Sequence, residues 1–172
     1  MRAERGYTLP ELIVVLAIIS LLITVTITYA LPWFAREDMR SAVYQVQVHL
    51  QVARVQAVTR NHACAFRVDT STGHVQVYDL NDPSLSTDDI LLTEFALPST
   101  VSFSDPGGGS AVTLTSLSST LFQATFGSDG SVTAGAGVIM MTGGNRYNRL
   151  SLFAAGGVRV DIWNGSAWVN GA

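Results

Sequence analysis

One stretch near the N-terminus limits what this chain can fold into more than any other feature. From Leu12 to Ala35 the sequence contains no charged residue. As a helix that rises about 1.5 Å per residue, this stretch spans roughly 36 Å, enough to cross a hydrocarbon core of about 30 Å. Glu11 stands at its edge, where a carboxylate is costly and is therefore by default a hypothesis for a functional residue. The sequence therefore predicts a membrane-spanning helix with a functional acid at its start.

A short polar leader, MRAERG, precedes this apolar region. A secretory signal peptide would be cleaved after its apolar region, beside small residues, and no convincing site of that kind follows Ala35. One interpretation is an uncleaved anchor, with Arg2 and Arg5 held on the cytoplasmic side of the membrane. The residue order GYTLPEL, from Gly6 to Leu12, favours a second interpretation.

That order closely resembles the class III leader of type IV pilins and type II secretion pseudopilins. The resemblance implies that a prepilin peptidase cuts the bond between Gly6 and Tyr7 and methylates the new amine of Tyr7. It also implies that Glu11 pairs with the Tyr7 amine of a neighbouring subunit in a filament. Pairing of Glu11 with its own amine, one helical turn away, and a place at the headgroup level are the alternatives. Pro10 departs from the usual aliphatic residue, but proline is tolerated in a first helical turn.

The helical period continues beyond the apolar stretch, from Met39 to about Asn61. Apolar or small residues follow one face at Val43, Val46, Leu50, Ala53 and Ala57, and a second face at Val48, Val52, Val55 and Thr59. A helix with two such faces requires two partners. One partner is the protein's own sheet, and the second face either meets neighbouring helices in a filament or is sunk in the same domain. Arg54 and Arg60 are either filament contacts or solvated charges.

The end of this segment carries a second resemblance. Residues 50–61 read L-x-x-A-R-x-x-A-V-x-R-N, which resembles the end of the long helix in the GspH/FimT family of minor pseudopilins and minor pilins. In that family a strand follows at once, and Cys64 to Val68 fits it. A later Phe-Gly-x-x-Gly and the sequence Gly-Gly-Val-Arg at 156–159 also resemble that family. Asn61 is expected to end the helix in the left-handed conformation.

Beyond Asn61 the apolar pattern changes from helical to alternating, which is typical of strands. The predicted strands cover residues 64–68, 74–78, 90–97, 100–104, 112–117, 121–126, 138–141, 149–154, 158–163 and 167–169. Gly156-Gly157 and Asn164-Gly165 predict hairpins between the last three. We therefore expect an α+β, pilin-like fold in which a long N-terminal helix packs on a C-terminal antiparallel β-sheet body, built as two small sheets.

The resulting domain organisation has four parts. Residues 1–6 form the leader peptide, and residues 7–35 form the transmembrane and assembly helix. Residues 36–61 continue as an amphipathic helix into the globular domain, and residues 62–172 form the β-rich pilin-like body.

No motif for catalysis or metal binding is recognisable in the sequence. The histidines, His49, His62 and His74, lack the spacing and the acidic or cysteine neighbours of a metal site. Cys64 is the single cysteine, which excludes an intrachain disulfide, and it is expected to be a buried strand residue rather than a nucleophile. We expect no enzyme activity, no cofactor and no metal.

DNA binding is the competing function. The formal net charge of −3 provides no global basic field. Some FimT-type minor pilins bind DNA through a C-terminal Gly-Arg-x-Arg motif, and residues 156–159 match it except that Gly157 replaces the first arginine. Arg146 and Arg149 could join Arg159 in space, with Tyr147 or Trp163 stacking on bases.

The resemblance implies a minor pilin or pseudopilin, a structural subunit of a type II secretion pseudopilus or type IV pilus that acts in assembly initiation or at the tip. Its expected partners are other pilins, prepilin peptidase and the inner-membrane assembly platform, with DNA added if it serves DNA uptake in natural transformation. We expect a single-pass protein of the bacterial inner membrane with a periplasmic or other extracytoplasmic body, which then enters the filament. A plain anchored β-domain is the third hypothesis.

Overall fold

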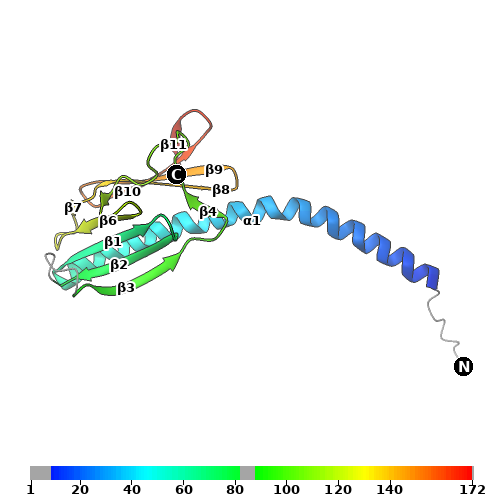
Figure 1. The fold of residues 1–172 in the computed structure, drawn as a ribbon, viewed down its shortest axis with the longest axis horizontal. Coiled ribbons are helices and arrows are strands. Elements are labelled where there is room, and N and C mark those ends of the chain that lie inside the picture. The colour runs from blue at the N-terminus through cyan, green and yellow to red at the C-terminus, as the bar shows by residue number, and fades with distance from the viewer. Residues whose placement is uncertain (1–8, 82–87, 172) are drawn as a thin grey trace, which may run out of the picture. The chain divides into compact units, whose positions relative to one another are not determined.

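The computed structural model describes residues 9–81 and 88–171, without the side chains of residues 28–32. The chain divides into two units, residues 1–34 and residues 35–172, and each is described by itself. One helix, α1 (Leu9–Arg60), supplies the described part of the first unit and the beginning of the second (Figure 1).

The first unit is an uncovered apolar helix. Its segment Leu9–Ile27 has a mean hydropathy of 2.5, none of it is buried, and by length and composition it can cross a membrane. Pro10 lies in the first helical turn, as predicted. The hydroxyl groups of Ser20 and Thr26 donate hydrogen bonds of 2.8 Å to the carbonyl oxygens four residues earlier, so their polarity is satisfied within the helix.

In the second unit, one face of α1 forms part of the core. The predicted face is buried along its whole length, at Val43, Val46, Leu50, Ala53 and Ala57. The helix ends at Arg60, and Asn61 follows with a φ of 54° in the left-handed region, as predicted.

The first sheet is antiparallel and begins immediately after the helix. Its strands are β1 (Ala63–Asp69), β2 (His74–Leu80), β3 (Ile90–Ala96), β5 (Thr115–Ser116), β6 (Leu121–Phe126) and β7 (Val132–Ala134). The strand order is β3-β2-β1-β6-β5, with β7 paired to β6. Alternate residues of β1 and β2, among them Phe66, Val68, Val75 and Val77, are completely buried and face the core.

The second sheet is also antiparallel. Its strands are β4 (Val101–Phe103), β8 (Gly137–Gly143), β9 (Arg146–Leu152), β10 (Val158–Trp163) and β11 (Trp168–Asn170), in the order β11-β10-β9-β8-β4. The two predicted hairpins join β9 to β10 and β10 to β11, with Gly156 and Gly165 at positive φ. Both sheets and the second part of α1 share one hydrophobic core, which confirms the predicted fold class.

Two predictions about strands need correction. The segment 112–117 is not one strand: only Thr115 and Ser116 pair with β6, whereas Val112 makes an isolated bridge to Ile139 of the other sheet. The segment therefore passes from one sheet to the other, and its apolar residues follow the core rather than one ladder. Strand β7 was not expected, because three residues are too short to show an alternating pattern.

Candidate assembly surface

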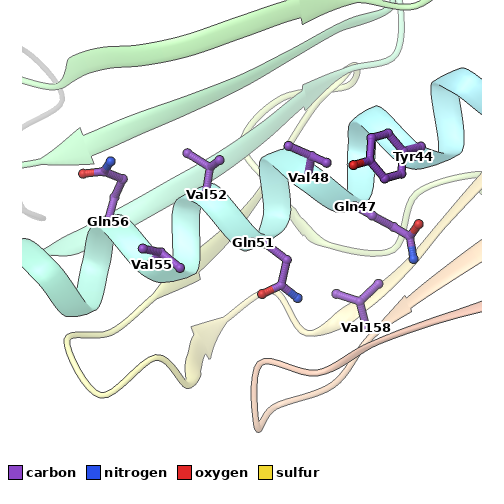
Figure 2. A pocket seen from close by; sticks show the side chains of 8 residues that line it. All are labelled: Tyr44, Gln47, Val48, Gln51, Val52, Val55, Gln56 and Val158. Carbon is purple, nitrogen blue, oxygen red and sulfur yellow. The ribbon is translucent and has the colours of Figure 1, made fainter.

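The second apolar face of α1 is only partly covered by the body. Tyr44, Val55 and Val58 are 64%, 57% and 50% exposed, and they lie on the side of the helix away from the sheets' core contacts. A groove of about 470 Å³ follows this side, and Figure 2 shows the side chains that line it: Tyr44, Gln47, Val48, Gln51, Val52, Val55, Gln56 and, from β10, Val158. We call the groove-lining residues that belong to the helix, from Tyr44 to Gln56, the outer face of α1. Of the predicted second face, Val55 and Thr59 are exposed and Val48 and Val52 are half-buried, which favours a face that is open to neighbouring helices over a helix sunk in its own domain.

The chemistry of this outer face is uniform. The valines recur at helical spacing and are interleaved with glutamines, and no charged side chain lines the groove. Val48 and Val52 are half-buried, so the floor of the groove is fixed by the body's own packing. A surface of this kind suits another apolar helix that can also accept or donate amide hydrogen bonds.

Arg54 and Arg60 both have partners within their own body. Arg54 donates a hydrogen bond of 3.3 Å to the carbonyl oxygen of Gly156. A Cβ atom at Gly156 would lie 2.3 Å from the carbonyl oxygen of Gly130, so only glycine allows the two turns to meet beside Arg54. Arg60 pairs with the buried Asp79 at 2.7 Å. These arginines join the helix to the sheets, which neither of the two sequence-based alternatives anticipated.

Glu11 is exposed, and it has no ion-pair or hydrogen-bond partner within residues 9–81 and 88–171. Gly6 and Tyr7, the predicted processing residues, lie outside the described part of the chain. Cleavage between them, methylation of Tyr7 and pairing with Glu11 therefore stay predictions.

Two of the three arginines that were candidates for DNA contact hold a carboxylate of their own sheet. Arg149 Nη2 lies 2.7 Å from Asp161 Oδ2, and Arg159 Nε lies 3.2 Å from Asp161 Oδ1. Asp161 is only 4% exposed. Burial raises the pKa of Asp161, but the hydrogen bond from Arg149 and the charges of both arginines outweigh it, so the pKa lies below its usual value. The carboxylate cancels about half of the charge that this pair could offer to phosphates.

The third arginine lies elsewhere. Because Arg146 and Arg149 are three residues apart on β9, their side chains leave opposite faces of the sheet. Arg149 stacks on Trp168 at 4.7 Å, and Trp168 contacts Trp163, whereas Arg146 lines a separate groove beside α1. The structure does not bring the three arginines together. The pairing role of Asp161 had a signal in the sequence, since Asp161 and Arg159 are two apart on one strand and share a face.

The remaining candidate residues serve the core. Cys64 is buried, and burial together with the charge of Asp79 raises its pKa to about 11, although Arg60 opposes this shift. His49 is buried as well, and its Nδ1 donates to the carbonyl oxygen of Gln45 at 2.8 Å. Within residues 9–81 and 88–171, no three His, Cys, Asp or Glu side chains are grouped so that they could hold a metal ion.

The first part of the helix is apolar and exposed, and its second part packs on antiparallel sheets. This arrangement defines a pilin-like protein. The sequence matches the profile of the family described as Type II transport protein GspH over residues 42–156, which is more than half of the chain. This chain therefore belongs to the GspH family. Residues 1–27 match the prokaryotic N-terminal methylation motif. The family that the sequence motifs resembled is thus confirmed.

Two solved structures have a similar fold. The minor pseudopilin EpsH from the Type 2 Secretion System of Vibrio cholerae has a TM-score of 0.50 and 16% identity, covering 72% of this chain and 95% of that chain. The type IV minor pilin FimU of Pseudomonas aeruginosa PAO1 has a TM-score of 0.50 and 16% identity, covering 78% of this chain and 94% of that chain. At this identity the likeness concerns the fold alone. No curated protein sequence matches this chain.

Proposed function

We propose that this chain is a minor pseudopilin or minor pilin that enters a filament of the type II secretion or type IV pilus kind, where it acts in assembly initiation or at the tip. The observation that carries this proposal is the exposure of apolar surface along α1, both in Leu9–Ile27 and on the outer face. Within residues 9–81 and 88–171 much of this surface is exposed, and exposed apolar surface of this kind is suited to lipid first and to other helices afterwards. The proposed partners are other pilins, the prepilin peptidase and the inner-membrane assembly platform.

In this proposal the chain is made as a precursor that is anchored in the bacterial inner membrane. Its body lies on the side of the membrane away from the cytoplasm. The peptidase cuts between Gly6 and Tyr7 and methylates the Tyr7 amine, which keeps its positive charge. Glu11 of one subunit then pairs with that amine in a neighbour. An unpaired carboxylate in an apolar surrounding costs a few kcal/mol, roughly, so the pair favours docked over undocked subunits.

A matched pair of variants tests the docking role. Glu11→Gln removes the charge inside the apolar part, and Glu37→Gln removes an exposed charge beyond it. Both are expressed as full chains in cells that carry the secretion or pilus machinery, and sheared filaments are probed for the subunit. We expect Glu11→Gln to lose incorporation and Glu37→Gln to retain it. Normal incorporation of Glu11→Gln would show that the pairing role is wrong.

Processing is tested separately by mass. The mature chain should lack residues 1–6 and carry one methyl group on Tyr7, and Gly6→Val should block cleavage because its side chain obstructs approach of the peptidase. An uncleaved native chain in cells with an active peptidase would leave the plain anchored β-domain as the better hypothesis.

DNA binding has weaker support as a second function. The cluster of Arg149, Arg159, Trp163 and Trp168 offers stacking and charge, but Asp161 occupies both guanidinium groups. Salt-dependent binding of single-stranded DNA by the full chain, lost in Arg159→Gln, would restore this hypothesis.

A further inference from the structure

A second groove lies on the body, separate from the outer face of α1 except for two shared residues. It has a volume of about 580 Å³ and runs between the beginning of α1 in the body and strands β9 and β10. Arg36 and Arg40 come from the helix, Arg146 and Asn148 from β9, and Val160 and Ile162 from β10. Each of the three arginines is exposed.

These arginines differ from all others in the described part of the chain. The other described arginines each have an acceptor in the protein: Arg54, Arg60, Arg67, Arg149 and Arg159. The guanidinium groups of Arg36, Arg40 and Arg146 have none within residues 9–81 and 88–171, and all three line the same groove. Glu37 is the one acid among the groove's lining residues, so the groove has an excess of positive charge. Guanidinium groups that line one groove and have no acceptor of their own are suited to a phosphate, which arginine frequently binds through two parallel hydrogen bonds.

The position of the groove in the sequence points to the source of that phosphate. Arg36 is the first charged residue after the uncharged stretch that ends at Ala35. Long basic side chains near the ends of a spanning helix extend to the headgroup level of the membrane. The groove also has apolar walls, Val160 and Ile162, beside its basic groups. An acidic side chain of a protein partner would match the charge, but it would account for neither this position nor the apolar walls.

We propose that this groove binds the headgroup phosphate of an anionic membrane phospholipid while the subunit is still in the membrane. The inference rests on the membrane stage of the proposed function. Arg36, Arg40 and Arg146 contact the phosphate, and the apolar walls contact the glycerol and first acyl carbons. Binding would hold the body at the bilayer surface before the subunit is extracted into a filament.

The test uses the purified full chain in detergent, titrated with phosphatidylglycerol, phosphatidylcholine or inorganic phosphate, and native mass spectrometry to count retained molecules. We expect phosphatidylglycerol to be retained in preference to phosphatidylcholine and not to be displaced by millimolar inorganic phosphate. Arg146→Gln should weaken this binding about fivefold, the factor that corresponds to about 1 kcal/mol per arginine near an anionic surface. Arg159→Gln is the matched control: it removes the same charge from an arginine that already has a partner, and it should change nothing.

Arg146 is informative because it is remote from the membrane segment in sequence, so its substitution reaches the lipid only through the folded groove. Its exposure makes unfolding an unexpected result, and a melting curve checks it; Arg40→Gln replaces it if the curve shifts. Four results would each overturn the proposal. Two concern the variants: unchanged lipid binding in Arg146→Gln, or an equal loss of lipid binding in Arg146→Gln and Arg159→Gln. Two concern the ligand: equal retention of phosphatidylcholine, or displacement of the lipid by inorganic phosphate. Lipid binding in detergent needs no filament, so a negative result leaves the role of Glu11 unaffected.

Discussion

Within the body, α1 presents two apolar faces that the structure treats in opposite ways. On the inner face, Val46, Leu50 and Ala53 have at most 1% of their surface exposed. On the outer face, Tyr44 and Val55 are more than half exposed. Hydrophobic periodicity alone therefore does not say whether a helix face belongs to the folded monomer or to an assembly.

The residue types on the two faces explain the difference. The inner face contains Ala53 and Ala57, whose small side chains let the sheets approach the helix closely. The outer face alternates valine with glutamine, which leaves a surface that water tolerates until a partner arrives. The inner face should determine the stability of the body, and the outer face should determine its association.

The largest effect is expected at Leu50, which is completely buried in the core. Leu50→Ala removes buried methyl groups and leaves a cavity, so it should lower the free energy of unfolding by about 2–5 kcal/mol. Urea unfolding followed by tryptophan fluorescence measures this change. Leu50→Met is the control, since a volume-conserving substitution should cost less than about 1.5 kcal/mol. A loss below 1 kcal/mol, roughly, for Leu50→Ala would mean that the inner face is not the main source of stability.

Cys64 reports on the same core from the sheet side. Its raised pKa, about 11 against 9.0, should reduce the thiolate fraction near pH 8 by about a hundredfold relative to an unperturbed thiol. Because the folded state holds the proton more tightly, this group's contribution to stability is complete below pH 9 and is lost as the pH rises towards 11. Labelling with a thiol reagent should be slow in the native chain and faster in Leu50→Ala. Rapid labelling of the native chain would contradict the burial of β1 against α1.

The parts of this fold that could be predicted from sequence are those set by local rules. The helix face from Val43 to Ala57 follows from the 3.6-residue period, and the left-handed Asn61 follows from the chemistry of helix ends. The hairpins at Gly156 and Gly165 follow from the same kind of local turn preference.

The parts that could not be predicted depend on which distant segments meet. Asp161 is shared by Arg149 and Arg159 because β9 pairs with β10. Arg146 lines one groove with Arg36 and Arg40 because this sheet packs on α1. The pairing of Arg159 with Asp161 could be expected from their spacing of two on one strand, but the other contacts join different elements of the structure. The sequence analysis named Arg146, Arg149 and Arg159 as one group, which the structure divides. It did not place Arg36 and Arg40 beside Arg146, because that grouping exists only in the tertiary structure.

A smaller effect is expected from adding volume to each face. Ala53→Leu on the inner face forces extra atoms into a packed core and should cost about 1–3 kcal/mol. Val55→Leu on the outer face meets solvent and should leave the melting temperature unchanged. The ratio of the two effects in thermal unfolding measures how different the faces are. Similar costs at both positions would show that the outer face is packed in the monomer after all.

The smallest effect on folding, and the sharpest separation of the two faces, is expected from Val55→Ser. Val55 is 57% exposed, so its replacement by a polar residue should change the free energy of unfolding by less than about 0.5 kcal/mol. The same change replaces an apolar side chain by a smaller hydroxyl group and so removes apolar area from a helix contact, and it should therefore reduce recovery of the subunit in sheared filaments. Ser41→Ala is the control: it changes another exposed residue of the helix, outside the groove, and it should leave both stability and recovery in filaments unchanged. If Val55→Ser keeps both stability and incorporation, then the outer face is not the surface through which this chain meets its neighbours, and the groove along it needs another occupant.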